Sequence, residues 1–279
     1  MSVISPLSQS NLPAVYHNGV WFVLGYIPST PDKLAAFPTW SDANHTLPQS
    51  EWREIDLDIY DLPVKNQGST SSCVGHGATS GMEMCVRQSG RPQETMSPYF
   101  TYAQINGDRD QGAMISDALT SLMKTGACPI GLAPRGAMYK QQFPSSCFEA
   151  AKGWRLLKAF RCDSFEEIAS AITLGFPVPL GIMVGQNFGQ LDSDGVAPLP
   201  GGGGGGHCIL GVGLKKLRRG WVIKIHNSWG VSWGMNGRAF ITPNHFRYMQ
   251  PDAFAIQSVS DDPGDNTPDD EVPEVRNAA

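Results

Sequence analysis

The spacing of hydrophobic residues changes from a helical period early in the chain to an alternating period late in it. Residues 114–125 carry apolar side chains at helical spacing, and Gly126 ends the pattern. Ser164 and Glu167 form a capping-box motif that predicts a second helix ending near Leu174. Up to this point the chain is therefore predicted to be mainly helical.

A further helix is predicted at residues 73–86, directly after Ser71 and Ser72. Serine hydroxyls commonly cap the first turn of a helix, so we expect these two residues to open it. Three glycines within the segment weaken its helix propensity. Glycines in such a place indicate close packing against another element.

Beyond residue 176 the period changes to two, which is typical of strands. Strands are predicted over residues 177–184, 208–214, 221–226 and 237–242. Six glycines at 201–206 predict a flexible loop before the second of these strands. Helices early and strands late predict an α+β fold with a helical left lobe, a β-barrel-like right lobe and a cleft between them.

The first fifty residues contain one apolar segment, from Val20 to Ile27, among many Pro, Ser and Thr residues. A bare linker would have no use for the aromatic rings of Trp21 and Phe22 in this segment. We therefore expect residues 1–50 to form an N-terminal extension that packs on the body with both rings buried. The alternative interpretation is a short strap that lies across the cleft and blocks it.

The chain has 279 residues and a formal net charge of −5, and the charge is unevenly placed. Residues 261–279 hold seven acids and one arginine, so the remainder is close to neutral. A neutral body gives no basic surface for nucleic acid. The acidic end predicts a disordered tail, with a docking tail as the alternative. Residues 51–260 are then predicted to be the folded domain.

The chain has no apolar run long enough for a membrane span and no basic, apolar leader, which predicts a cytoplasmic protein without membrane contact. The six cysteines show no framework spacing, so we expect mostly free thiols in a reducing compartment. A bridge between Cys147 and Cys162 is left open. No metal-ligand spacing appears, and neither a metal nor a cofactor is predicted.

Four polar residues carry the candidate chemistry. Gln67 precedes Cys73 by six residues, and His207 and Asn227 follow far downstream. A thiol is a weak nucleophile until a base removes its proton, and that base must be oriented by a third group. The negative oxygen that forms on an attacked carbonyl needs hydrogen-bond donors. Gln, Cys, His and Asn in this order therefore indicate a thiol hydrolase.

These residues and their neighbours resemble the papain family of cysteine peptidases. The stretch from Gln67 to Cys73 reads Gln-Gly-Ser-x-x-Ser-Cys, His207 lies 134 residues after Cys73, and Asn227 lies 20 residues further on. Asn-Ser-Trp-Gly at 227–230 is similar to the second signature of the family. The likeness runs from about residue 56 to 254 and is nearest in kind to lean bacterial and phage-type members without a long propeptide.

The chain departs from the family pattern at three places. Val74 stands where an aromatic residue usually follows the nucleophile, and Thr70 stands where a cysteine would form a disulfide. The usual Gly-Gly pair on the left wall of the cleft is reduced to Gln111-Gly112. None of these changes removes a catalytic group.

The resemblance implies a role for each of the four residues. Cys73 would be the nucleophile, and its place at a helix start beside His207 predicts a thiol pKa below the usual value. His207 would hold the proton, Asn227 would orient the imidazole, and Gln67 would form the oxyanion hole with the N–H of Cys73. His76 lies one helical turn from Cys73 and is assigned to packing, because that position leaves no room for substrate.

Substrate contacts follow from the resemblance as well. Gly112 matches the glycine whose backbone pairs with an extended peptide. Gly181 and Cys208 match positions that line the pocket for the residue two before the scissile bond, and their small size predicts a roomy apolar pocket with no charged residue at its base. Trp229 is expected beside the substrate, where its indole would shield the bond between the base and its orienting amide.

The sequence as a whole predicts a cysteine-type endopeptidase that hydrolyses polypeptides through an acyl-enzyme on Cys73. Two alternatives stay open. One is a catalytically silent papain-like binding or scaffold component. The other is an acyl transferase or isopeptidase, which would use the same four residues up to the acyl-enzyme. The sequence makes no prediction of the oligomeric state.

Overall fold

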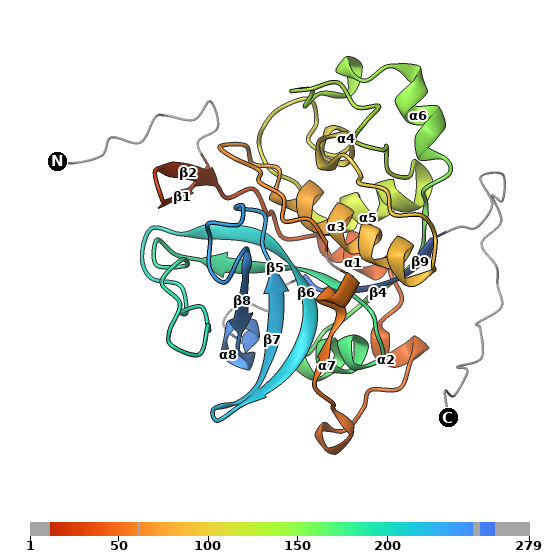
Figure 1. The fold of residues 1–279 in the computed structure, drawn as a ribbon. Helices are drawn as coiled ribbons and strands as arrows, with labels where there is room; N and C mark the ends of the chain where they lie inside the picture. The colour runs from red at the N-terminus through yellow and green to blue at the C-terminus, as the bar shows by residue number, and fades with distance from the viewer. Residues whose placement is uncertain (1–11, 61, 248–251, 260–279) are drawn as a thin grey trace.

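The computed structural model describes residues 12–60, 62–247 and 252–259, which form a helical lobe and a sheet lobe (Figure 1). The predicted α+β, two-lobed fold is confirmed. The predicted acidic tail at residues 261–279 lies outside the described residues. Within the described parts, no helix is long and apolar enough to cross a membrane.

The helical lobe is built around α3 (Cys73–Gln88), which contacts α4 (Pro98–Ala103) and α5 (Ile115–Lys124). Helix α6 (Ser145–Ala151) lies at the outer end of this lobe (Figure 1). The helices predicted at 73–86 and 114–125 are both present. Gly126 ends α5 as predicted, with a φ of +87° that favours glycine.

Helix α3 begins at Cys73, but the prediction of serine capping is wrong. The Ser72 hydroxyl makes no capping hydrogen bond and instead pairs with the Thr70 hydroxyl at 2.6 Å. The glycines of α3 do mark close packing. A Cβ on Gly77 would lie 2.8 Å from the sulfur of Cys208, which is closer than such atoms approach. The helix can therefore lie directly against the sheet lobe.

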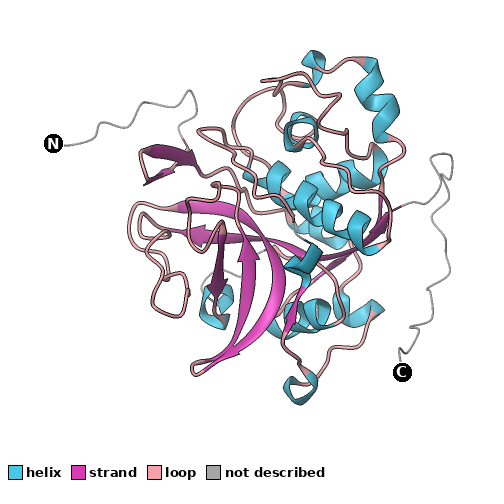
Figure 2. Ribbon diagram, viewed as in Figure 1, coloured by secondary structure: helices cyan, strands magenta, loops and turns pink. Residues whose placement is uncertain are grey.

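The sheet lobe contains a curled five-stranded antiparallel sheet (Figure 2). Its central strand is β6 (Gly205–Leu217), which pairs along one edge with β5 (Val178–Val184) and β3 (Ile55–Asp56). The other edge of β6 pairs with β7 (Gly220–His226), and β7 pairs with β8 (Arg238–Ile241). A register shift in the β6–β7 ladder adds local bend and twist. All four predicted strands are present.

The remaining helices and strands join the lobes or cover their edges: β1 (Ala14–His17), β2 (Val20–Val23), α1 (Pro31–Ala35), α2 (Trp40–Ala43), η1 (Gln49–Glu51), η2 (Leu57–Tyr60), η3 (Lys140–Gln142), β4 (Leu156–Arg161), α7 (Phe165–Thr173), α8 (Pro243–Arg247) and β9 (Phe254–Val259). The predicted cap of α7 is half correct. The Ser164 hydroxyl accepts from the N–H of Glu167 at 3.1 Å. The Glu167 carboxylate, however, accepts from the N–H of Asp163, one residue earlier than a capping box requires.

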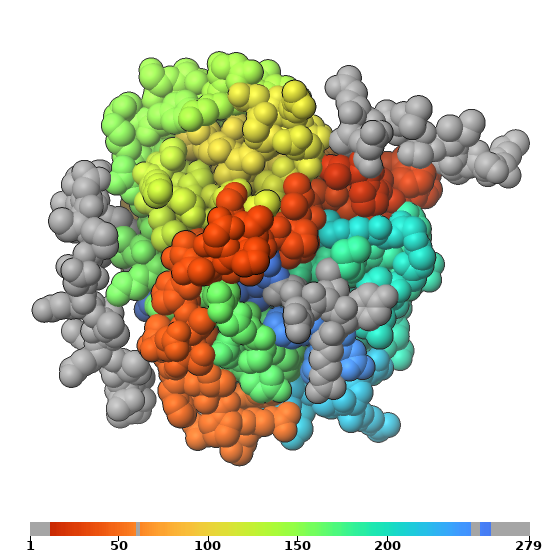
Figure 3. Space-filling model, turned by 180° about the vertical axis from the view of Figure 1, so that it is seen from behind, coloured from red at the N-terminus to blue at the C-terminus, as the bar shows by residue number. Residues whose placement is uncertain are grey.

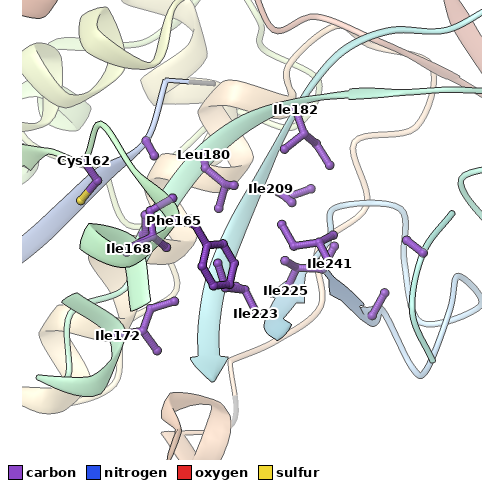
Figure 4. Packing of buried hydrophobic residues seen from close by; sticks show 14 of the residues in the cluster. Cys162, Phe165, Ile168, Ile172, Leu180, Ile182, Ile209, Ile223, Ile225 and Ile241 are labelled. Carbon is purple, nitrogen blue, oxygen red and sulfur yellow. The ribbon is translucent and has the colours of Figure 1, made fainter. Parts of the chain in front are cut away.

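The core of the sheet lobe forms where α7 packs against the sheet (Figure 4). Ile168 and Ile172 of α7 lie one turn apart on one face, and both are fully buried. They belong to the same cluster as Leu180 of β5 and Ile223 of β7. This packing fixes the central strands, and so fixes the position of any residue that β6 and β7 present to the other lobe.

The N-terminal extension packs on the body through the hairpin of β1 and β2. Phe22 is buried as predicted, and its ring stacks on Trp229 with centroids 4.8 Å apart. Trp21 is only half-buried and contacts Tyr16, so the prediction for this ring is wrong. Neighbouring strand residues point to opposite faces, which allows only one of the two rings to face inward.

The glycine run at 201–206 is more than the flexible loop that was predicted. Gly205 and Gly206 already belong to β6. A side chain on Gly205 would collide with Pro13, and one on Gly206 would collide with the carbonyl oxygen of Tyr26. The glycines therefore make room for the N-terminal extension beside β6.

All six cysteines are buried free thiols, so the bridge left open between Cys147 and Cys162 does not form. Cys147 lies beside Cys128 instead. Burial and this neighbouring thiol raise the pKa of Cys128 to about 12.

Candidate active site

The packing of α3 against β6 brings the start of the helix with the predicted nucleophile close to the strand that carries the predicted base. Cys73 is the first residue of α3, His207 is the third residue of β6, and neither has any solvent exposure. Cys208, which directly follows His207, lies close enough to Cys73 for the two residues to affect each other's ionisation. The two lobes therefore meet at these residues.

The side chain of Asn227 fixes the orientation of the His207 ring. Nε2 of His207 lies 2.7 Å from Oδ1 of Asn227. The same oxygen accepts from the backbone N–H of Ser228 at 2.8 Å, which holds the amide in place. An amide oxygen only accepts hydrogen bonds, so Nε2 carries the proton of the neutral ring and Nδ1 keeps its lone pair. Among the described residues this buried Nδ1 has no hydrogen-bond partner.

Aromatic rings enclose this imidazole–amide pair. The fully buried indole of Trp229 lies 4.9 Å from the imidazole of His207, measured between ring centroids. Phe188 packs against both rings, at 5.5 Å from Trp229 and 6.1 Å from His207. This apolar enclosure keeps water from competing for the bond to Asn227.

The amide of Gln67 is held with its donor facing the site. Its Oε1 accepts from the Ser228 hydroxyl at 2.8 Å, so its Nε2 must point the other way. That nitrogen donates to the carbonyl oxygen of Thr70 at 2.9 Å and to the carbonyl oxygen of Val23 at 3.0 Å. The second acceptor comes from the N-terminal extension rather than from the enzyme body.

Residues 23–29, which we call the strap, cross the site between the two lobes. Figure 3 shows this part of the chain, in red to orange, running along the seam between the lobes. The N–H of Tyr26 donates to the carbonyl of Gly206 at 3.1 Å, and the N–H of Gly25 lies close enough to the Cys73 thiol to favour its charged form. The preferred interpretation of the sequence, that the N-terminal extension only packs on the body, is therefore incomplete. The extension packs on the body and also lies over Cys73, which is the position that the alternative interpretation gave it.

On the wall of the helical lobe the strap pairs with Ala113 rather than with the predicted Gly112. Ala113 donates to the carbonyl of Gly25 at 2.8 Å and accepts from Ile27 at 3.0 Å. The N–H of Gly112 donates within the wall, to the Tyr102 hydroxyl at 3.0 Å among others. A Cβ on Gly112 would collide with the strap, so this glycine makes room for a peptide without bonding to it here.

Gly181 and Cys208 both lie against the side chain of Tyr26. A Cβ on Gly181 would collide with the Tyr26 ring, and Cys208 is close enough to affect its ionisation. The prediction that no charged residue lies at the base of this pocket is wrong. The buried Asp252 lies at the hydroxyl end of the ring, and its N–H donates to the Tyr26 hydroxyl at 3.3 Å.

Burial controls the ionisation of the predicted pair in this covered state. It raises the pKa of the Cys73 thiol to about 11, although backbone donors at the helix start oppose the shift. Burial lowers the pKa of His207 to about 4, and the bond to Asn227 only partly offsets this. The prediction of a lowered thiol pKa is therefore wrong while the strap is in place. Both side chains are held neutral.

His76 has the environment of a packing residue. Its Nδ1 lies 3.0 Å from the carbonyl oxygen of Ser72, and its ring meets Tyr99 edge-on at 5.3 Å. The ring is buried, and burial lowers its pKa to about 3. It is thus held neutral within the helical lobe.

Sequence reasoning missed three features of the site. Ser228 orients the Gln67 amide, and its position inside the Asn-Ser-Trp-Gly motif is a signal that could have found it. Asp252 is distant in sequence from the other site residues and carries no local signal. The third feature is a carboxylate beside the helix start, Asp110, which accepts from the N–H of Ser71 at 2.9 Å.

A family model and several relatives match this chain by sequence. The model for papain family cysteine proteases matches residues 47–250. An uncharacterized peptidase C1-like protein of Acanthamoeba polyphaga mimivirus is 26% identical over 288 residues, which are 88% of this chain and 92% of that protein. Cathepsin K of Mus musculus is 26% identical over 238 residues, which are 74% of this chain and 66% of that protein.

Among solved structures, xylellain, a cysteine protease from Xylella fastidiosa, is similar with a TM-score of 0.72 and 24% identity. The match covers 85% of this chain and 96% of xylellain. At this identity the likeness speaks for the fold alone. The family model, in contrast, spans well over half of the sequence, including all four predicted catalytic residues. This chain therefore belongs to the papain family of cysteine proteases.

Proposed function

We propose that this protein is a cysteine-type endopeptidase that hydrolyses polypeptides through an acyl-enzyme on Cys73. One observation carries the proposal. The peptide carbonyl of Val23 accepts from Nε2 of Gln67 at 3.0 Å, and the backbone N–H of Gly25, two residues on, lies close enough to the Cys73 thiol to favour its charged form. The site thus already holds a peptide backbone between the proposed oxyanion donor and the proposed nucleophile.

In the proposed reaction, Nδ1 of His207 takes the proton of the Cys73 thiol. The thiolate then attacks the carbonyl carbon of the scissile bond, and Gln67 donates to the resulting oxyanion. His207 returns its proton to the leaving amine as the C–N bond breaks, which leaves a thioester on Cys73. Water, deprotonated by His207, then attacks the thioester and releases the acid product and the free thiol.

The proposed enzyme is latent while the strap is in place. Cys73 and His207 have no solvent exposure, and burial disfavours the charged form of each. Departure of the strap would admit water and substrate together, which removes the cost of forming the thiolate–imidazolium pair.

The test is hydrolysis of a fluorogenic peptide panel by the full chain and by Gly25→Ala. A Cβ on Gly25 would collide with the backbone of Ser71, so this variant should displace the strap. We expect cleavage that is faster in Gly25→Ala and is abolished by an added Cys73→Ala or Cys73→Ser change with the fold intact. Cleavage that survives loss of Cys73 would refute the assignment.

The same panel separates the two alternatives. A scaffold component would cleave nothing, even when alkylation shows that Cys73 is accessible. An acyl transferase would release products only when an amine acceptor is added.

A further inference from the structure

The side chain of Tyr26 has the surroundings of a bound ligand. Its ring is 6% exposed although it comes from a segment that lies across the surface of both lobes. The ring rests on the bare backbone of Gly181 and next to the side chain of Cys208. Because a Cβ on Gly181 would overlap the ring, this flat space exists only for an occupant without bulk on that side.

The far end of this space is polar in a specific way. The backbone N–H of Asp252 donates to the Tyr26 hydroxyl at 3.3 Å. The carboxylate of the same residue lies beside the hydroxyl, and its charge adds to burial in raising the pKa of Tyr26 far above the usual value. One residue therefore offers a donor and an acceptor to a single hydroxyl group.

The second oxygen of this carboxylate is used by the strap itself. Oδ2 of Asp252 accepts from the N–H of Ser29 at 2.7 Å, and both residues are buried. When the strap leaves, Asp252 loses this partner and the tyrosine hydroxyl together. A buried carboxylate without partners is costly, so the open pocket would favour an occupant that restores a donor.

We propose that Asp252 makes this pocket selective for tyrosine in the substrate, at the position that the papain-like resemblance assigns to the residue two before the scissile bond. The inference rests on the proposed peptidase function and names the substrate class of that site. Tyr26 occupies the pocket as the chain's own copy of the preferred side chain.

The pair of polar groups distinguishes tyrosine from its competitors. Phenylalanine and leucine fill the apolar space but leave both the N–H and the carboxylate of Asp252 unpaired. Arginine satisfies the carboxylate, yet a guanidinium has no acceptor for the N–H. A site built to hydrogen-bond a hydroxyl rejects analogues without it far more strongly than an apolar pocket rejects a change of size.

The first arm of the test uses the full chain and does not depend on turnover. The rate at which iodoacetamide labels Cys73, followed by mass spectrometry, reports how often the strap opens. Tyr26→Phe should raise this rate about tenfold, because the ring stays and only the hydroxyl is lost. In an Asp252→Ala background the same change should raise it less than twofold, since the partner is already absent. Equal rates for wild type and Tyr26→Phe would overturn the proposal.

The second arm compares kcat/KM of Gly25→Ala for peptides that differ only in Tyr, Phe, Leu or Arg at the selected position. Tyrosine should exceed phenylalanine about tenfold or more, and Asp252→Ala should bring the ratio close to one. The comparison of tyrosine with phenylalanine uses the Gly25→Ala variant alone, so it can be made even if the Asp252 variant folds poorly. Equal rates for tyrosine and phenylalanine, or faster cleavage after arginine, would overturn the assignment.

The two arms also separate failure of this inference from failure of the proposed function. If no peptide is cleaved but the labelling rates show the coupling between Tyr26 and Asp252, the peptidase function is wrong and the tyrosine pocket stands. If peptides are cleaved without preference for tyrosine, the peptidase function stands and the pocket assignment is wrong.

Discussion

Each proposed catalytic group depends on a neighbour that fixes one atom of its side chain. The bond between Asn227 and Nε2 of His207 leaves Nδ1 of the ring as the acceptor. The bond between Ser228 and Oε1 of Gln67 leaves Nε2 of that amide as the donor. Ser228 also supplies the N–H that steadies Asn227. A single serine therefore orients both the base and the oxyanion donor, one through its backbone and the other through its hydroxyl.

The hydroxyl of Ser228 can be tested without touching the backbone bond. In Gly25→Ala, an added Ser228→Ala change should lower kcat about tenfold and leave KM nearly unchanged, because a loosened Gln67 amide weakens only the bond made to the oxyanion. Ser228→Thr, which keeps a hydroxyl, should restore part of the loss. A rise in KM with unchanged kcat would show that Ser228 acts on substrate binding instead.

Local motifs in the sequence suggest the proposed catalytic groups but carry no information on their state of ionisation. Local motifs mark Cys73, His207, Asn227 and Gln67, and in the fold His207 bonds to Asn227 while Gln67 bonds to the neighbouring Ser228. The raised pKa of Cys73 could not be predicted, because it comes from complete burial of the thiol, which depends on how distant segments pack in the folded chain. Asp252 was missed for the same reason, since only the folded chain brings it to Tyr26.

Among the elements, the strap differs most from what its sequence pattern predicted. The hydrophobic spacing predicted an apolar segment that packs, and Phe22 does pack on Trp229. The covering of Cys73 depends on Gly25, where the strap passes against the backbone of Ser71. A glycine in an irregular segment carries no sequence signal for such an approach.

Gly25→Ala should therefore release the strap without unfolding the body. We expect iodoacetamide to label Cys73 at least tenfold faster than in wild type, because an added Cβ cannot fit against the Ser71 carbonyl. Gly131→Ala is the matched control, since a Cβ there meets nothing within 4 Å. Unchanged labelling of Gly25→Ala, with the control also unchanged, would show that the strap does not limit access.

A buried ion pair ties the segment before Gln67 to α3. Lys65 contacts Glu83 at 2.5 Å with side chains 9% and 1% exposed, and Glu83 also accepts from the N–H of Met96 at 2.7 Å. Lys65→Met would leave the Glu83 carboxylate buried without its cation. We expect a loss of about 3 kcal/mol in the free energy of unfolding, measured in urea.

Lys152→Met is the control for this change, because the pair of Lys152 with Glu149 is exposed on both sides. Surface pairs of this kind contribute little, so its effect should stay within about 0.5 kcal/mol. Equal losses for the two variants would mean that burial of the Lys65 pair has no energetic consequence.

At the scale of the whole molecule, the two-lobed architecture was predictable because it follows from a change of period along the chain. Helical spacing predicted α5, the serines before Cys73 predicted α3, and alternating spacing predicted β5 to β8. The relation between the lobes was not predictable from spacing. It depends on close contacts such as Gly77 against Cys208 and on a strap that fills the seam, and these arise only when distant segments meet.

Burial of neutral histidines throughout both lobes predicts that the molecule loses stability in acid. Burial lowers the pKa of His207 and of His226 to about 4 and that of His76 to about 3, and it also lowers the pKa of His245. In the unfolded chain these groups titrate near 6.5. Between pH 6.5 and 4 the unfolded state therefore binds more protons than the native state, and stability falls as the pH falls. Each fully buried ring should contribute on the order of 2–3 kcal/mol to the loss by pH 4.

Urea unfolding at a series of pH values tests this expectation with a variant that lies outside the proposed catalytic groups. His226→Gln removes one buried imidazole, so the free energy of unfolding should fall less steeply with acid than in wild type. Protonated His207 favours contact with water, and His207 lies close to the strap. The rate of Cys73 labelling, divided by the rate for a free thiol at the same pH, should therefore also rise as the pH approaches 4. A free energy of unfolding that is the same at pH 7 and pH 5 would show that these histidines take up protons as readily in the native protein as in the unfolded chain, and that burial does not lower their pKa.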